Sequence, residues 1–273
     1  MNATPASTGP SHDDLKACCA AAYSGDVVAL LLGESYHPGG TALTRRLADG
    51  LALSPGARVV DVASGRGTTA LLLADTYGAH VDGVDYSTAN VAFAQSAAEA
   101  RGLSERAVFT VGDAERLPYP DAGFDAAVCE CALCTFPGKS AAAAEFAHVL
   151  RPGGRLGITD VTADPGRLPP ELTTLAARIA CIADARPLEE YAAILEAAGL
   201  RTVRTERHDE AMTRMIDQIE ARLALLRMTV PDRLAEAGID LGASGPVFAA
   251  ARAAVAEGTL GYALLIAENT AAA

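Results

Sequence analysis

One short stretch of this 273-residue chain limits its fold more than any other: an apolar run that stops at a Gly-x-Gly turn. The apolar run 59–62 is followed by Gly65 and Gly67, and a helical pattern begins directly afterwards. A second apolar run, 81–84, ends in an acid, Asp85. The order strand, glycine turn, helix, strand and acid predicts a nucleoside-binding crevice at one edge of a parallel sheet.

The residue types in this stretch suit that chemistry. Gly65 and Gly67 have no Cβ and can adopt positive φ, so the backbone can turn sharply and a ligand can approach closely. The helix that begins near Thr68 directs its free N–H groups and its positive dipole end into the crevice. Asp85 can accept hydrogen bonds from two ribose hydroxyls. The pattern alone does not separate dinucleotides from other nucleosides, and an ordinary strand-to-helix turn can also carry Gly-x-Gly.

Further apolar runs alternate with helical patterns along the chain, which predicts parallel βαβ units and an α/β doubly wound sheet. The predicted strands are 58–62, 80–84, 107–111, 124–129, 155–160, 201–206 and 259–267. The predicted intervening helices are 68–76, 88–101, 139–150 and 188–198.

The remaining segments predict a helical cover over the carboxyl ends of the strands. Residues 1–10 are predicted to be a disordered lead, 11–50 an N-terminal helical cap, and 51–273 the nucleoside-binding domain. A helical insertion at about 209–257 separates the last two strands and contributes to the cap.

Charge and composition limit the classes of molecule that this protein is expected to bind. The net charge is −12, which disfavours nucleic-acid phosphates and anionic membrane surfaces and favours a small substrate. No apolar run reaches transmembrane length, and the first ten residues lack a secretory pattern. We therefore expect a cytoplasmic protein that is a monomer or a homodimer.

The opening stretch and three further motifs, in order, resemble the class I S-adenosylmethionine-dependent methyltransferases. Segments 112–119, 124–128 and 149–156 are similar to that family's adenine segment, fourth strand and turn into the fifth strand, and 61–67 is similar to its first motif. The resemblance implies a seven-stranded Rossmann-like sheet of order 3-2-1-4-5-7-6 with the last strand antiparallel, and S-adenosylmethionine as cofactor. The rival is a dinucleotide-dependent oxidoreductase, in which segments 112–114 and 150–154 are not expected together. The implied cofactor-binding residues are Asp61, Ala63, Ser64, Gly65, Gly67, Asp85, Tyr86, Asp113, Ala114 and Glu130.

Three cysteines gather where the fourth strand ends: Cys129, Cys131 and Cys134. One interpretation is that these cysteines act as small buried hydrophobic side chains, and it fits Cys129 best. A zinc site is a second, because Cys131 and Cys134 have C-x-x-C spacing, but no second C-x-x-C or spaced histidine pair supplies the other ligands. Capture of a soft, thiophilic substrate is the third.

Segments 125–131, 158–164 and 180–200 resemble the arsenite methyltransferases. That resemblance implies that Cys131 and Cys181 bind trivalent arsenic as substrate. The family usually carries a further cysteine upstream of the first motif, where this chain has Gly33-Glu34-Ser35-Tyr36. Cys134, or Cys18 or Cys19 folding over from the cap, is then the candidate third ligand.

Other acceptors remain open. Methylation of an oxygen in a metabolite generally needs a base, and the candidates are His37, in the turn 36–40, and Glu130, at the end of the fourth strand. The alternative function is therefore a small-molecule O-, N- or C-methyltransferase of metabolism or natural-product biosynthesis. A catalytically silent nucleoside-binding protein is disfavoured by the intact first motif with Asp85 and Asp113.

Overall fold

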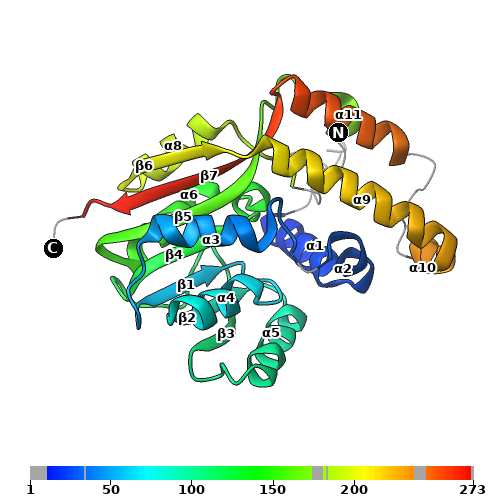
Figure 1. The fold of residues 1–273 in the computed structure, drawn as a ribbon. Coiled ribbons are helices and arrows are strands. Elements are labelled where there is room, and N and C mark those ends of the chain that lie inside the picture. The colour runs from blue at the N-terminus through cyan, green and yellow to red at the C-terminus, as the bar shows by residue number, and fades with distance from the viewer. Residues whose placement is uncertain (1–10, 34, 174–180, 183, 237–243, 272–273) are drawn as a thin grey trace, which may run out of the picture.

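A seven-stranded sheet organises the molecule (Figure 1). The computed structural model describes residues 11–33, 35–173, 181–182, 184–236 and 244–271. The strand order β3-β2-β1-β4-β5-β7-β6 confirms the predicted order, and β7 runs antiparallel to both of its neighbours. The strands are β1 (Arg58–Val62), β2 (His80–Asp85), β3 (Ala107–Val111), β4 (Phe124–Glu130), β5 (Leu150–Ala163), β6 (Leu200–Arg207) and β7 (Leu260–Asn269).

β5 is longer than its sequence pattern predicts. It pairs with β7 continuously from Arg155 to Ala163, three residues past the predicted end at Asp160. It also begins earlier, at Leu150, which pairs with Phe124 across an irregularity in the β4–β5 register. Pro152 and the glycines after it predict a break, and Gly153 does turn with a φ of 73°, but the strand resumes at Arg155 opposite Ala126.

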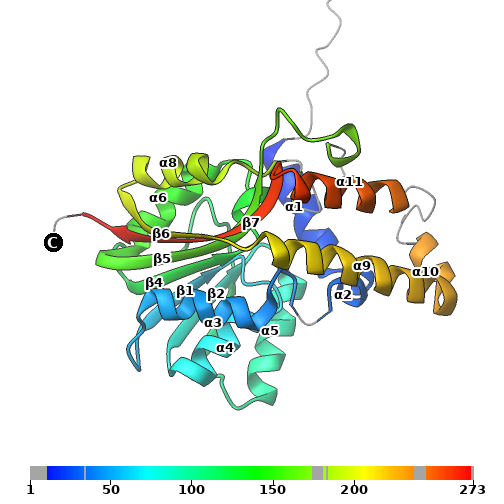
Figure 2. The same cartoon turned by 45° about the horizontal axis from the view of Figure 1, so that its top comes forward.

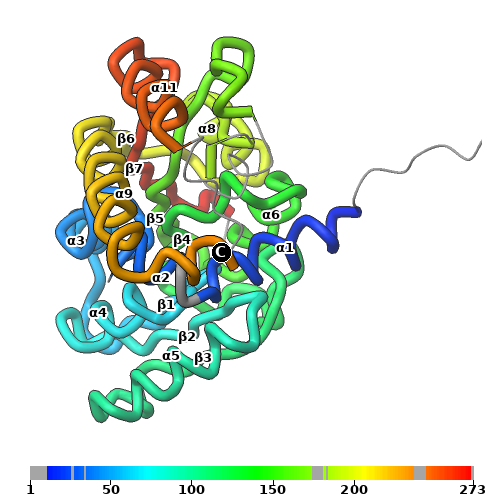
Figure 3. The backbone as a smooth tube through the Cα atoms, turned by 90° about the vertical axis from the view of Figure 1, so that its right-hand side faces the viewer, coloured from blue at the N-terminus to red at the C-terminus, as the bar shows by residue number. Residues whose placement is uncertain are grey.

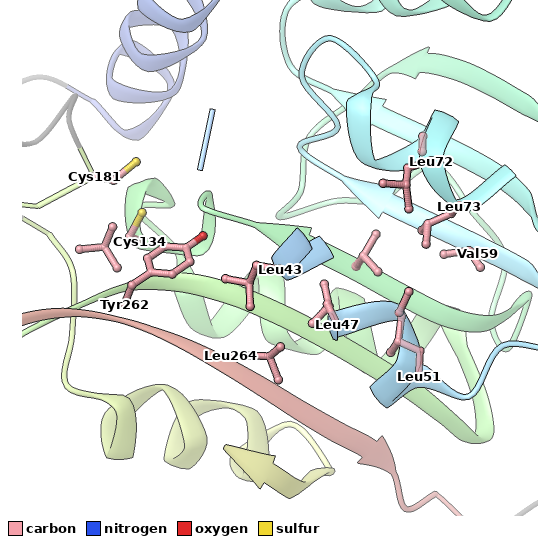
Figure 4. Close-up of a cluster of buried hydrophobic side chains, with 14 of the residues drawn as sticks. Leu43, Leu47, Leu51, Val59, Leu72, Leu73, Cys134, Cys181, Tyr262 and Leu264 are labelled. Carbon is pink, nitrogen blue, oxygen red and sulfur yellow. The ribbon is translucent and has the colours of Figure 1, made fainter. Parts of the chain in front are cut away.

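Helices cover both faces of the sheet (Figure 2). One face carries α3 (Gly40–Leu51), α4 (Thr68–Tyr77) and α5 (Thr88–Ala100), and the other carries α6 (Lys139–Val149) and α8 (Leu188–Ala197). Side chains alternate along β1, so Val59 belongs to the core under α3 and α4, whereas Val60 belongs to the core under α6 and α8. Figure 4 shows part of the first core.

The other helices gather beyond the carboxyl ends of β1, β4 and β5, at the end of the molecule that Figure 3 faces. They are α1 (His12–Ser24), α2 (Asp26–Leu32), α9 (Asp209–Thr229), α10 (Pro231–Glu236) and α11 (Ser244–Ala256). Ser11 caps α1 through a reciprocal capping box with Asp14. Two short 3₁₀ turns, Leu133–Thr135 and Pro170–Leu172, complete the described elements.

One part of the predicted cap lies elsewhere. α3 falls within the 11–50 segment, yet it lies on the sheet, where Leu43, Leu47 and Leu51 are buried in the core of that face. The reason is its apolar stripe at i, i+4 and i+8, which suits a sheet-covering helix. The predicted lead, 1–10, lies outside the described residues. Among the helices of the described residues, none combines the length and apolar character that a membrane crossing requires.

Candidate functional site

A crevice of about 590 Å³ opens where β1, β2 and β4 end. Helix α1 and the turn before α3 form its outer wall, so both the sheet and the N-terminal helices contribute to it. The predicted site residues that line it are His37, Asp61, Ala63, Ser64, Gly65, Asp85, Tyr86, Asp113, Ala114, Glu130, Cys131 and also Cys19.

The β1–α4 loop forms the floor through an unusual backbone. Ala63 and Gly65 both have positive φ, 59° and 53°. A Cβ on Gly65 would meet nothing within 4 Å, so this glycine leaves open space on the crevice side. Ligand atoms can therefore approach the loop backbone closely.

Gly67 has a different role from the predicted one, because it is not among the described residues that line the crevice. Its φ is 81°, and a Cβ there would lie 2.8 Å from Phe109 and 2.9 Å from Ala94. Gly67 therefore lets α4 begin in close contact with β3 and α5.

Asp85 is fixed in place at the end of β2. Its Oδ2 accepts from the Gly65 N–H at 2.8 Å, and its Oδ1 accepts from the Ser87 N–H at 2.9 Å and from Asn90 at 3.2 Å. Burial raises its pKa, and these donors oppose that rise. The carboxylate is thus oriented by the chain and keeps lone pairs for hydroxyl donors in the crevice.

Two buried polar atoms on the crevice floor lack a hydrogen-bond partner among the described residues: Asp61 Oδ2 and Ser64 Oγ. Burial raises the pKa of Asp61 well above its usual value, and the charges on Glu130 and Asp85 raise it further. A buried acceptor without a partner is costly unless a ligand supplies a donor. The floor is therefore suited to a cationic group with N–H donors.

Two acids and a lysine meet at the other end of the crevice. Asp113 Oδ1 accepts from the Glu115 N–H at 2.9 Å. Lys16 Nζ, on α1, lies 2.9 Å from Asp113 Oδ2 and 2.7 Å from Glu115 Oε2. The predicted adenine-contacting acid is therefore in the crevice, with a cation from the N-terminal helix beside it.

Glu130 is surrounded by hydroxyls. Thr69 and Thr44 donate to its Oε2 at 2.6 Å and 3.0 Å, and Thr159 donates to its Oε1 at 3.1 Å. His37 Nε2 lies 3.6 Å from the same carboxylate. This arrangement makes Glu130 a fixed negative charge facing the crevice.

His37 is buried, with 8% of its surface exposed, although its glycine-rich turn suggests a surface loop. Its Nδ1 lies 3.2 Å from the Pro38 carbonyl oxygen, and its Nε2 lies 3.3 Å from Thr44 Oγ1. Both ring nitrogens thus have protein partners, which limits the capacity of His37 to act as a base.

The thiols of Cys131, Cys134 and Cys181 lie close enough to perturb one another's pKa, and Cys181 Sγ lies 3.5 Å from the Cys131 carbonyl oxygen. This contact joins the end of β4 to a residue fifty positions later in the chain, and Figure 4 shows Cys134 and Cys181 side by side. Donation from Cys131 and Cys134 lowers the pKa of Cys181 well below its usual value, whereas burial and neighbouring charges raise that of Cys134. The pKa directions make Cys181 the most acidic of the three thiols.

Only the first of these three cysteines lines the crevice; Cys134 and Cys181 lie behind it and are almost fully buried. Among the described side chains, no group of three or more His, Cys, Asp and Glu is arranged to hold a metal ion. Cys129 is wholly buried in the core, in line with its interpretation as a small hydrophobe. Cys18 is exposed.

Sequence reasoning missed several residues that support these groups. Asp160 accepts from the Cys134 N–H at 3.0 Å, and Lys139 donates to the Cys134 carbonyl oxygen at 2.9 Å. Tyr23, from α1, lies 2.9 Å from Cys181 Sγ through its hydroxyl oxygen. Lys16 and Tyr23 are seven residues apart and so share one face of α1, which is a signal that helical periodicity offers.

Comparison with known proteins agrees with this geometry. A profile of the methyltransferase domain matches residues 59–154, which span β1 to the start of β5. The methyltransferase GfsG of Streptomyces halstedii is 35% identical over 164 residues, 59% of this chain and 59% of that protein. The 27-O-demethylrifamycin SV methyltransferase of Amycolatopsis mediterranei is 34% identical over 191 residues, 64% of this chain and 70% of that one. The first of these relatives is thus matched over less than two thirds of its length.

Solved structures share the whole fold. The [4+2]-cyclase SpnF superposes with a TM-score of 0.75 and 26% identity, covering 97% of this chain and 98% of that one. The phosphoethanolamine N-methyltransferase 2 of Haemonchus contortus, solved with S-adenosyl-L-methionine, superposes with a TM-score of 0.74 and 17% identity, covering 98% of this chain and 62% of that one.

The crevice residues fit this cofactor. Asp61 and Ser64 would offer acceptors without a partner among the described residues to a cationic amino-acid portion, and Asp85 would offer an oriented carboxylate to ribose hydroxyls. When bound, S-adenosylmethionine supplies an electrophilic methyl group on a sulfonium. With the first-motif loop, the ordered acids and the relatives in agreement, the chain belongs to the class I S-adenosylmethionine-dependent methyltransferases.

Proposed function

We propose that this enzyme methylates trivalent arsenic held as substrate by Cys131, Cys134 and Cys181. The observation that carries the proposal is the position of these three thiols beside the cofactor crevice, which Cys131 lines, with Cys181 Sγ 3.5 Å from the Cys131 carbonyl oxygen. Cys131 and Cys134 lie in one turn directly after β4, and Cys181 lies in a segment fifty residues later in the chain. Sulfur ligands prefer soft centres such as arsenic(III).

The cluster suits this substrate chemically. Each arsenic–sulfur bond displaces a hydroxide or thiolate that arsenic carried in. Where the cysteine is a thiol, its proton leaves with that group as water or as free thiol. Because Cys181 already lies against Cys131, small side-chain movements would let the sulfurs share one arsenic atom. Arsenic with three sulfur ligands is pyramidal and keeps a lone pair, so methyl transfer to it requires no proton removal.

The surroundings support acceptor chemistry without a base. Glu130 accepts from three threonine hydroxyls, and both nitrogens of His37 contact protein atoms. Either residue would have to give up such contacts to take a proton from an acceptor. The task left to the chain is to position the acceptor and to exclude water.

The test is product speciation after incubation with labelled S-adenosylmethionine, arsenite and a thiol. Wild-type enzyme should yield methylated arsenic. C131S, C134S and C181S should each lose at least about tenfold in rate, because a hydroxyl is a hard, weak ligand for arsenic. C18S is the matched control, since Cys18 is exposed, and it should keep the wild-type rate.

Cofactor affinity, measured by calorimetry, should be unchanged in all four variants. The proposal fails if wild-type enzyme makes no methylated arsenic, or if C131S and C181S make it at the wild-type rate.

Methylation of a metabolite hydroxyl is the second candidate, favoured by the similarity to the 27-O-demethylrifamycin SV methyltransferase. Its base would be His37, which is buried in the crevice wall. In this case H37Q should abolish activity on the hydroxyl acceptor while C181S leaves it intact, the reverse of the pattern expected for arsenic.

A further inference from the structure

Helix α1 reaches both ends of the site. Lys16 contacts the acids at the Asp113 end of the crevice, and Tyr23, two turns later on the same helix, contacts the thiol cluster. Seven helical residues span about 10 Å, so one rigid element bridges the two ends. Figures 1 and 3 both place α1 beside the carboxyl ends of the strands.

Polar contacts are a large part of what holds α1 in place, because none of its residues is fully buried. The Lys16 ion pairs are shielded from solvent: the lysine side chain is 12% exposed and that of Glu115 is 12% exposed. Shielded charge-assisted contacts of this kind are stronger than pairs on an open surface.

At the other end, the Tyr23 hydroxyl oxygen lies 2.9 Å from Cys181 Sγ. The Tyr23 ring also packs against Tyr36, with ring centroids 6.4 Å apart. Cys181 itself has a positive φ of 65°, a backbone conformation that a cysteine rarely adopts and that persists only where surrounding contacts hold it. Its sulfur lies 3.5 Å from the Cys131 carbonyl oxygen.

We propose that α1 is a strap in which Tyr23 positions the Cys181 sulfur within the thiol cluster, and Lys16 anchors the strap at the Asp113 end of the crevice. The role of Tyr23 in acceptor binding rests on the proposed function; the anchoring of α1 over Cys181 does not. Tyr23 acts through Cys181 and is a positioning residue.

The anchoring is tested by site-resolved alkylation of the cofactor-free enzyme with iodoacetamide at one pH, read by peptide mass spectrometry. K16A should accelerate alkylation of Cys181 by about tenfold, because the buried thiol is uncovered when the anchor is lost. K16R keeps the charge and should stay near the wild-type rate. Cys129, buried in β4, reports unfolding of the sheet and should stay protected in every variant.

The positioning is tested by steady-state kinetics of Y23F with arsenite. The ring stays while the hydroxyl is lost, so KM for arsenite should rise at least about fivefold with the affinity for S-adenosylmethionine unchanged. Y77F is the matched control. The Tyr77 hydroxyl contacts the Arg45 carbonyl oxygen and Asp49 Oδ1 on the surface, and loss of this hydroxyl should leave KM for arsenite unchanged.

The outcomes separate the two proposals. If wild-type enzyme methylates no arsenic but K16A still exposes Cys181, the strap stands and the acceptor assignment fails. If arsenic is methylated but K16A leaves Cys181 protected or Y23F keeps the wild-type KM, the strap and its positioning residue are refuted.

Discussion

Backbone strain at single residues coincides with the site. Cys131 and Cys181 both have positive φ, 54° and 65°, although neither is a glycine. Strain of this kind costs about 1–3 kcal/mol per residue and persists where surrounding contacts fix it. At Cys131 one such contact is its N–H donating to the Thr159 carbonyl oxygen at 2.6 Å. The strained geometry brings two distant sulfurs together.

Substitution of Asp85 tests its predicted role in cofactor binding. D85A should weaken binding of S-adenosylmethionine by about 1–3 kcal/mol, about 5- to 150-fold, because the ribose hydroxyls lose their charged acceptor. Titration calorimetry measures it. D82N is the control, since Asp82 lies on the same strand and pairs with Arg58. Equal affinities in D85A and wild type would remove Asp85 from the cofactor site.

Asp160 makes folding stability depend on pH. Burial, followed by the charge on Cys181, raises its pKa from 3.8 to about 7. The unfolded chain therefore releases this proton before the folded chain does, and the contribution to stability that is present below pH 4 is lost as pH rises to about 7.

In the D160N variant the amide that replaces the carboxyl group cannot ionise. The variant's unfolding free energy should improve relative to wild type between pH 4 and 7 and then run parallel to it at higher pH. Urea denaturation at pH 4, 5.5 and 8 measures the difference, and a constant difference across the three values would contradict the raised pKa.

At the scale of elements, α3 is part of the sheet's core although it lies in the segment predicted as a cap. L47A should destabilise the protein by about 2–5 kcal/mol, because Leu47 is buried against β5. L225A, on α9, removes the same atoms from a side chain that is 58% exposed and should cost less than about 0.5 kcal/mol. Similar denaturation midpoints for the two variants would place α3 outside the core.

Most elements follow from the sequence, and the misses have physical causes. The strand at Arg58–Val62 and the helix from Thr68 form where the apolar run, the glycines and the helical period predict them. β5 extends beyond its apolar pattern because β7 supplies hydrogen-bond partners as far as Ala163. Such pairing is tertiary, and no local signal at that position encodes it.

At the scale of the whole molecule, cofactor binding and folding are linked. S-adenosylmethionine at about 100 times its Kd should stabilise the folded chain by about 2.7 kcal/mol, which raises the Tm by several degrees. Differential scanning fluorimetry measures it. NAD at the same concentration should leave the Tm unchanged, and a comparable rise with NAD would favour the oxidoreductase interpretation.

The sequence by itself determined the α/β doubly wound class and the acids at the carboxyl edge, because glycine turns and strand-end acids are local signals at fixed spacing. The sheet order and the donor followed from the resemblance to the methyltransferase family. Arsenic as acceptor stays a prediction. Only the tertiary structure decided the surroundings of that site: it buried His37, enclosed Glu130 in threonine hydroxyls and brought Cys181 to Cys131 and Cys134. The tertiary structure also places Tyr23 against Cys181 and Lys16 against Glu115, at opposite ends of the site. These contacts join residues up to 158 positions apart. Packing and loop closure create them, and neither leaves a pattern in neighbouring residues.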